Sequence, residues 1–273
     1  MIDMFAQDFI LNALLISIVM GLMLAYLGVH VVGRGIVFVD LALGQISMLG
    51  VAVGNFIEKD QTLISIIFTM VGAFLLSFIK IKDKRLKQEA IIGIVYAFAS
   101  AATVLFISKS PHGESDISEV LFGSVFTVTN EQIGTMASVF AVIGIFHVIF
   151  RKKFFDLTHK FENHEIEEVG VFNLWNFLFY LSIGLAIVLA VRSAGVIPVF
   201  SYLIIPPVSA ILLSRKKAAM IVVALVVAVL GSFFGIYFST QFDFPAGSSV
   251  VAILSLFFGV SALVRWLNNF QRG

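Results

Sequence analysis

The chain has no cysteine, and charged residues make up only 13% of its 273 residues. Without cysteine there is no disulfide framework, no thiolate metal site and no cysteine nucleophile. The net charge is +1, whereas a protein that binds nucleic acid needs clustered Lys and Arg on an exposed face. Composition therefore excludes nucleic acid as a partner.

Nucleotide-binding and hydrolase motifs are also missing. The sequence contains no GxxxxGK[ST] loop, no HExxH and no GxSxG, and no GxGxxG lies between a strand and a helix. The chain alone cannot bind ATP in the P-loop manner. Any energy that it uses must come from a partner or from an ion gradient.

Apolar residues dominate instead, at 59% with 29 Phe and a mean hydropathy of +1.03. They form segments of about 20 residues, the length that an α-helix needs to cross a bilayer. We expect an all-α polytopic membrane protein with about nine transmembrane helices, eight being possible, in one transmembrane domain over residues 1–273. The nine segments are 9–32, 36–56, 62–81, 89–108, 132–150, 172–192, 196–214, 217–239 and 247–268. The first is too long for the apolar core of a signal peptide and is taken as a retained helix.

Basic residues gather on alternate loops. They are Lys80, Lys82, Lys84, Arg85 and Lys87 after the third segment, Arg151, Lys152, Lys153 and Lys160 after the fifth, Arg215, Lys216 and Lys217 after the seventh, and Arg265 and Arg272 near the C-terminus. The positive-inside rule places these loops in the cytoplasm of a cell whose plasma or inner membrane holds the protein. The N-terminus then faces outward and the C-terminus faces the cytoplasm.

Three segments depart from a plain spanning pattern. Pro198, Pro206 and Pro207 predict a broken helix in 196–214, which membrane depth tolerates only beside protein or a polar cavity. The external loop 109–131 includes the apolar stretch 119–128, which is too short to span and suits a half-helix. The polar stretch 154–171 is read as a cytoplasmic segment in which Asn163 would begin a short amphipathic helix, although composition alone leaves an ordinary solvated loop equally open.

Ionisable groups inside apolar segments are candidates for function because burying them is costly. Asp40 is the strongest candidate, with Gln45 and Ser47 following on the same segment. Small residues there would let another helix approach closely. The alternative is that Asp40 only pairs with a basic group such as Arg34.

Other polar residues favour structural explanations. His30 and His147 lie near cytoplasmic helix ends, and Glu89 opens the fourth segment, where a carboxylate suits the helix dipole. The external His112, Glu114 and Asp116 are of a kind that suits divalent cations, but a plain loop is the favoured explanation.

Five stretches together resemble the membrane-spanning permeases of ABC importers for divalent metals, the zinc, manganese and iron type called ABC type 3. They are GRGIVFVDLALGQISMLGVAVG (33–54), EAIIGIVYAFASAATVLFIS (89–108), DISEVLFGSVFTVTNEQI (116–133), VRSAGVIPVFSYLIIPPVSAILL (191–213) and FDFPAGSSVVAI (242–253). The resemblance implies a permease homodimer, separate ATPase subunits and an extracytoplasmic solute-binding protein. It also implies that 154–171 contacts the ATPase through Glu165, Glu167, Glu168 and Gly170, and that Ser47, Glu89, Pro206 and Pro207 serve the pathway or its packing.

The second segment departs from the family pattern, which has a His four residues after the Asp. Here position 44 is Gly, and Gln45 is the nearest polar side chain after Asp40. Asp40 and Gln45 are the candidate metal ligands, and their oxygens suit Mn²⁺ better than Zn²⁺. Glu89 stands where the family commonly has Asp.

The sequence therefore predicts a permease subunit of an ATP-driven importer of Mn, Zn or Fe, with ATP on a partner and no cofactor bound by this chain. A permease for a non-metal substrate and a non-transporting ABC scaffold remain alternatives. An intramembrane enzyme is the least favoured, because only Asp40 and Gln45 with scattered Ser offer polar groups.

Overall fold

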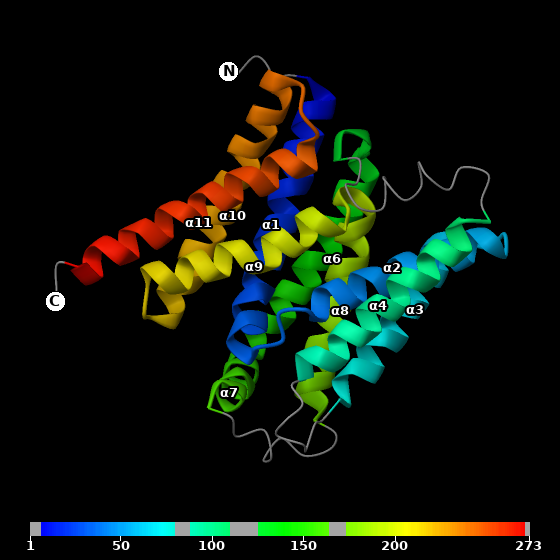
Figure 1. Ribbon diagram of the computed structural model, residues 1–273, viewed down its shortest axis with the longest axis horizontal. Coiled ribbons are helices and arrows are strands. Elements are labelled where there is room, and N and C mark those ends of the chain that lie inside the picture. The colour runs from blue at the N-terminus through cyan, green and yellow to red at the C-terminus, as the bar shows by residue number, and fades with distance from the viewer. Residues whose placement is uncertain (1–6, 80–87, 110–124, 164–172, 271–273) are drawn as a thin grey trace. The chain divides into compact units, whose positions relative to one another are not determined.

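The computed structural model describes residues 7–79, 88–109, 125–163 and 173–270, which form ten α-helices and one 3₁₀ turn (Figure 1). The elements are α1 (Asp8–Arg34), α2 (Val39–Phe56), α3 (Gln61–Ser77), α4 (Gln88–Ile107), η2 (Val125–Thr127), α6 (Asn130–Ile149), α7 (Arg151–Glu162), α8 (Leu174–Ala194), α9 (Val196–Leu213), α10 (Lys217–Phe242) and α11 (Ala246–Phe270). Every helix except α7 matches one of the nine predicted apolar segments. The all-α prediction is confirmed.

Eight of these helices are long and apolar enough to cross a membrane. The ninth apolar helix, α3, has 17 residues and is shorter than an ordinary span. Of the predicted half-helix, only the part after residue 124 is described, and there the chain forms the 3₁₀ turn η2.

The chain divides into two compact units. One comprises residues 1–32, 122–142 and 193–273, and the other comprises 33–121 and 143–192. We call them the outer-sequence unit and the inner-sequence unit, after their places in the chain, and describe each by itself.

In the outer-sequence unit, α9, α10 and α11 pack against one another. The buried Tyr202 hydroxyl of α9 lies 2.5 Å from the Ser232 hydroxyl of α10, so each polar group has a partner away from lipid. Helix α1 approaches α9 at Gly28, where an added Cβ would lie 2.0 Å from the Leu203 carbonyl oxygen. Only a residue without a side chain fits there.

Helix α9 runs unbroken through Pro206 and Pro207, so the prediction of a broken helix is wrong. Because Pro207 has no N–H, it cannot donate to the Leu203 carbonyl one turn earlier. That carbonyl instead lies against Gly28 of α1, where the missing side chain allows a C–H contact. Close packing of a neighbouring helix thus replaces the cavity that the prolines predicted.

In the inner-sequence unit, α2 packs against α3 and α4. An added Cβ on Gly50 would lie 2.6 Å from the Ser65 Cα, so the backbones of α2 and α3 come close together. Beside this contact the Ser47 and Ser65 hydroxyls lie 2.9 Å apart, and the Ser65 hydroxyl donates to the Ser47 carbonyl. Small residues on α2 are what allow this approach.

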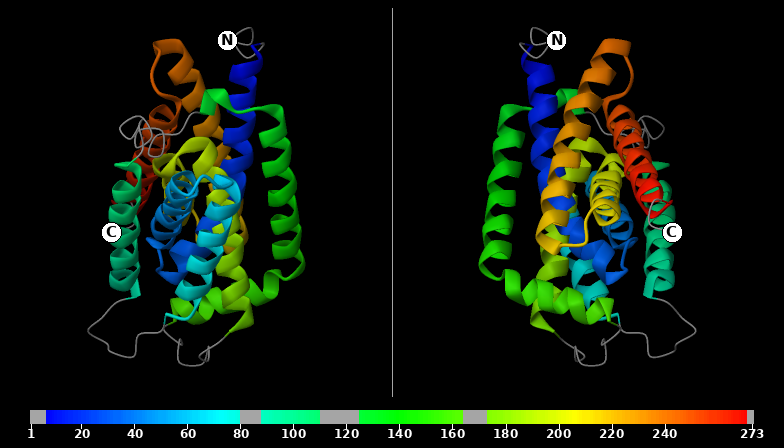
Figure 2. Two further views of the ribbon diagram at one scale, coloured as in Figure 1. Left: turned by 90° about the vertical axis from the view of Figure 1, so that its right-hand side faces the viewer. Right: turned by 90° about the vertical axis from the view of Figure 1, so that its left-hand side faces the viewer.

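Helix α7 turns sharply away from the end of α6 at Phe150 (Figure 2). Its buried residues are Phe154, Leu157 and Thr158, and with the half-buried Phe161 they recur at helical spacing, so the helix is amphipathic. Asn163 is the C-cap of α7, and the short helix that we expected Asn163 to begin falls on 164–170, outside the described residues. The charged residues around this apolar face concealed the helix from a search for long apolar segments.

Candidate functional site

Asp40 lies in the first turn of α2 and is buried, with 3% of its surface exposed. Neither carboxylate oxygen accepts a hydrogen bond of ordinary geometry from the described residues. The backbone N–H groups of Asp40 and Leu41 supply favourable dipoles, as at other helix N-termini. A buried carboxyl group with so little support is costly, which is typical of a side chain kept for function.

Arg34 does not pair with Asp40 within the described part of the chain, so the alternative that Asp40 is merely a salt-bridge partner of Arg34 is wrong. The Arg34 Nε donates to the Thr158 hydroxyl of α7 at 3.1 Å, and its Nη1 donates to the Asn176 Oδ1 of α8 at 3.2 Å. The guanidinium carbon lies 3.6 Å from the centre of the Phe179 ring. Arg34 is thus held by neutral groups and an aromatic face.

The network around Arg34 extends to a third helix. The Asn176 Nδ2 donates to the carbonyl of Ser77, the last residue of α3, at 3.3 Å. Arg34 ends α1 and precedes Asp40 by six residues. The network therefore joins α7, α8 and the end of α3 to the short connection that leads into α2.

Aromatic residues of α6 and α8 also pack against α7, beside the Arg34 network. Phe154 is fully buried and stacks on His147 of α6, with ring centres 4.0 Å apart and planes inclined by 2°. Trp175 and Phe179 of α8 pack around Phe154 at ring-centre distances of 5.8 and 6.3 Å. His147 takes part in this packing, and in the other unit His30 packs edge-on against Tyr26 at 5.5 Å.

The remaining candidates of α2 lie on different faces. Gln45 is buried, with 6% exposed, and follows Asp40 by five residues, which is about 140° around a helix and about 7.5 Å along it. A site that used both side chains would need them to reach toward one ion from different sides, or further groups from other helices. Ser47 faces α3 through Ser65.

The other predicted residues are scattered. Glu89 lies half-buried in the first turn of α4, while Pro206 and Pro207 are buried inside α9. Glu165, Glu167, Glu168 and Gly170 lie outside the described residues, as do His112, Glu114 and Asp116. Over the described ranges no three His, Asp or Glu side chains gather as a metal site would require.

The Arg34 network was not foreseen from the sequence, which suggested Arg34 only as a partner of Asp40. Its hydrogen-bond partners lie 124 and 142 residues away. The available signal was a set of polar residues at the ends of apolar segments, which does not say which of them meet.

Comparison with known proteins decides the family, because residues 6–265 match the ABC 3 transport family. The chain belongs to the ABC 3 transport family. This confirms the resemblance and identifies a multi-pass membrane permease subunit of an ABC transporter, with ATP hydrolysis on a separate subunit. An ABC system also implies an ATPase and a binding protein as partners.

Individual members of the ABC 3 family agree over nearly the whole length. A manganese transport system membrane protein of Listeria monocytogenes is 27% identical, covering 94% of this chain and 90% of that protein. A Haemophilus influenzae protein named as a probable iron transport system membrane protein is 25% identical, covering 96% and 92%. The solved structure of PsaBC from Streptococcus pneumoniae in complex with Fab has a TM-score of 0.79 at 26% identity, covering 96% of this chain and 95% of that one.

Proposed function

We propose that this permease carries Mn²⁺ or Fe²⁺ inward and that Asp40 with Gln45 meets the ion along its path. The observation that carries the proposal is a buried carboxyl group without a hydrogen-bond donor of ordinary geometry among the described residues, in a permease of this family. Relatives of similar length are named for manganese and iron transport. Carboxylate and amide oxygens suit these ions, and a transient site has to be weak enough for the ion to leave.

The substrate is tested by uptake into vesicles that hold the permease with its ATPase and binding protein. We expect ATP-dependent uptake of Mn²⁺ or Fe²⁺ and weaker uptake of Zn²⁺. Gln45→His restores an imidazole to this helix and is expected to shift preference toward Zn²⁺. Uptake of none of these ions would contradict the proposal and favour a non-metal substrate or a scaffold.

The second part of the proposal concerns the cytoplasmic partner. The segment 154–171 is proposed as the contact with the ATPase, and the amphipathic α7, which overlaps its first part, is anchored by Phe154 and Thr158. Combined replacement of Glu167 and Gly170 is expected to uncouple or dissociate the ATPase while the permease stays folded. The control is replacement of Lys152, an exposed residue at the start of α7. Normal ATPase stimulation and recovery of the complex would remove this segment from the mechanism.

Orientation and assembly complete the proposal. The N-terminus is proposed to face outward and the C-terminus to face the cytoplasm, in a permease homodimer. Because the chain has no native cysteine, single cysteines report the side cleanly. Cysteines at Lys84, Lys153 and Lys216 are expected to resist impermeant thiol reagents added outside, while cysteines at Ser110 and Gln241 react. Outside labelling at Lys84 would reverse the orientation.

Asp40 is buried by a single copy of the chain. Its carboxyl group is therefore shielded from lipid without a second permease. The homodimer is proposed from the family resemblance alone, and crosslinking of the purified permease measures it.

A further inference from the structure

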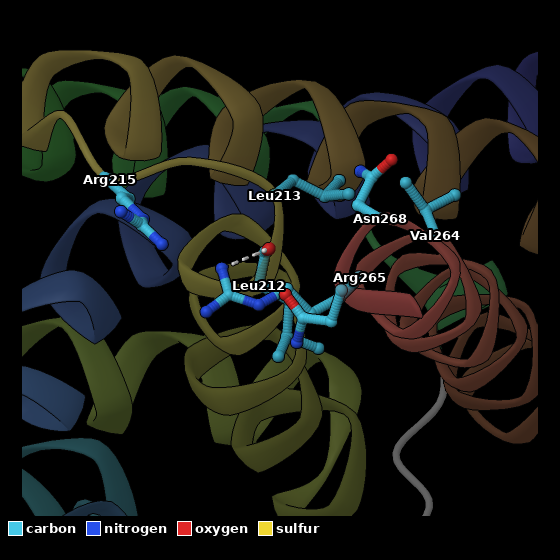
Figure 3. Close-up of a pocket in the computed structure, with 7 residues that line it drawn as sticks. Leu212, Leu213, Arg215, Val264, Arg265 and Asn268 are labelled. Atoms are coloured by element: carbon cyan, nitrogen blue, oxygen red, sulfur yellow. Dashed lines mark hydrogen bonds between the residues drawn. The ribbon is translucent and has the colours of Figure 1, made fainter. Parts of the chain in front are cut away.

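A small polar pocket opens at the ends of two spanning helices in the outer-sequence unit, with a volume of about 290 Å³ (Figure 3). It is lined by Leu212 and Leu213 at the end of α9, by Arg215 just after it, and by Val264, Arg265, Asn268 and Asn269 of α11. Arg265, Asn268 and Asn269 share one helix face because they are spaced by three and four residues. The pocket therefore presents two cationic groups and two amides together.

The residues that line this pocket offer more hydrogen-bond donors than acceptors. Arg265 donates one N–H to the Leu212 carbonyl at 3.4 Å, and a guanidinium carries five N–H donors (Figure 3). None of the described residues that line the pocket carries a carboxylate. Between residues 193 and 273 the one acidic side chain is that of Asp243, which lies just before α11 and is separated from Arg265 by about 29 Å of that helix. The α9 C-terminus offers only a partial negative charge, so the pocket fits an external anion.

The surroundings indicate which anion. Exposed apolar side chains flank the pocket on α11, and they are Trp266 (61% exposed), Leu267 (46%) and Phe270 (77%). Trp at the end of a spanning helix is typical of the headgroup layer of a bilayer. A basic pocket between helix ends at that depth suits a lipid headgroup, and its apolar neighbours suit acyl chains.

We propose that this pocket binds the phosphate of an anionic phospholipid. Arg215 and Arg265 supply the charge, Arg265 offers paired donors to the phosphate oxygens, and Asn268 and Asn269 add neutral donors. The lipid would stabilise the ends of α9 and α11 and fix their depth in the membrane. This role is independent of the ion that the permease transports.

The test measures thermal unfolding of the purified full-length permease in detergent, titrated with phosphatidylglycerol, phosphatidylcholine or inorganic phosphate. Stabilisation is expected with phosphatidylglycerol and not with the other two. Arg265→Gln and Arg215→Gln are each expected to weaken the apparent affinity about fivefold, the effect of one basic residue near a charged surface. Lys216→Gln is the control, since it removes the same charge from the same loop without lining the pocket.

Four results would overturn the proposal. Equal stabilisation by phosphatidylcholine would make the site a general acyl-chain contact, and equal stabilisation by inorganic phosphate would make it a free-anion site. If Arg265→Gln lowers the melting temperature but leaves the affinity for phosphatidylglycerol unchanged, Arg265 serves only to cap α9. If the Arg variants bind lipid normally but lose the ATPase, the pocket receives an acidic protein surface. None of these measurements requires transport, so failure here leaves the proposed function untouched.

Discussion

The two units differ in the charged side chains that they bury. In the outer-sequence unit, two polar groups of α9 meet neighbouring helices. The Leu203 carbonyl lies against Gly28 of α1, and the Tyr202 hydroxyl lies beside the Ser232 hydroxyl of α10. In the inner-sequence unit, Arg34 and Asp40 are buried without an opposite charge among the described residues. Among those residues no buried Asp, Glu, Lys or Arg falls in the outer-sequence unit.

We interpret this difference as one between a structural part and a part that serves transport. A packed unit without buried charge carries no cost of charge desolvation, whereas an unmatched buried charge lowers stability unless it serves a function. We therefore interpret the outer-sequence unit as the packed frame, and the inner-sequence unit as the part whose charged groups take part in transport and coupling. The predictions below test this contrast.

The largest expected effect is at the contact between α1 and α9. Gly28→Ala would place a methyl group 2.0 Å from the Leu203 carbonyl oxygen, so the helices must separate. We expect a loss of about 3 kcal/mol, the upper part of the range for overpacked cores, with a low yield of folded protein. Thermal unfolding in detergent measures it.

The matched control is Gly259→Ala, since nothing lies within 4 Å of an added Cβ on that glycine of α11. There the change is expected to be neutral or to stabilise by up to about 1 kcal/mol. Similar melting temperatures for the two variants would mean that α1 and α9 are not held as closely as described.

A smaller effect is expected from the Arg34 network. Arg34→Lys keeps the charge but cannot donate to Thr158 and Asn176 from one planar group, and we expect a loss of about 2 kcal/mol. Thr158→Val removes one acceptor and is expected to cost about 1 kcal/mol.

Both changes are expected to reduce stimulation of the ATPase more than they reduce folded yield, because they loosen α7. The ratio of ATPase rates with and without the permease measures this. If the loss of stimulation only parallels the loss of folded protein, the network is purely structural.

In the outer-sequence unit, removing one hydrogen bond is expected to lower stability without lowering transport. Tyr202→Phe removes the hydroxyl that lies 2.5 Å from the Ser232 hydroxyl, and we expect a loss of about 1 kcal/mol with normal transport per folded molecule. Tyr237→Phe, at a half-buried position of α10, serves as the comparison. A transport defect in the Tyr202 variant would break the division between frame and function.

The smallest effect depends on pH. Asp60 lies outside the spans and caps α3, accepting backbone N–H bonds from Leu63 and Thr62 that lower its pKa below the usual value near 3.8. A lowered folded-state pKa means that the stabilisation is present above that usual value and is lost as pH falls through the folded-state pKa. The melting temperatures of Asp60→Ala and the unmodified protein are expected to differ at pH 7 and to converge as pH falls through the folded-state pKa of Asp60. A pH-independent difference would contradict a charged cap.

Most of the fold could be predicted from the sequence because apolar length decides where helices cross a membrane. The helices that correspond to 36–56 and 217–239 begin and end within about three residues of the expected bounds. Helix α7 was missed since its amphipathic stripe lies in a strongly charged stretch. The break expected at Pro206 was wrong, because the effect of a proline depends on whether a neighbour such as Gly28 can approach the freed carbonyl.

The site could be predicted only as separate residues. Asp40 could be recognised from the sequence as a candidate functional residue, because burying a carboxylate within an apolar helix is costly wherever it lies. The partners of Arg34 could not be found, since Thr158 and Asn176 meet it only through the packing of α7 and α8. Sequence periodicity reports which face a residue occupies on its own helix, and does not report which helix that face will meet.

The central claim is that Asp40 is retained for transport at a cost in stability. The most direct test is ATP-driven Mn²⁺ uptake by vesicles that hold the Asp40→Asn permease with its ATPase and binding protein. Asp60→Asn is the control, because Asn also caps a helix well. We expect the Asp40 variant to fold in normal yield, to melt at an equal or higher temperature, and to lose at least about nine-tenths of uptake, equivalent to about 1.4 kcal/mol or more. Uptake equal to that of the unmodified protein would show that Asp40 is structural and that the ion passes elsewhere.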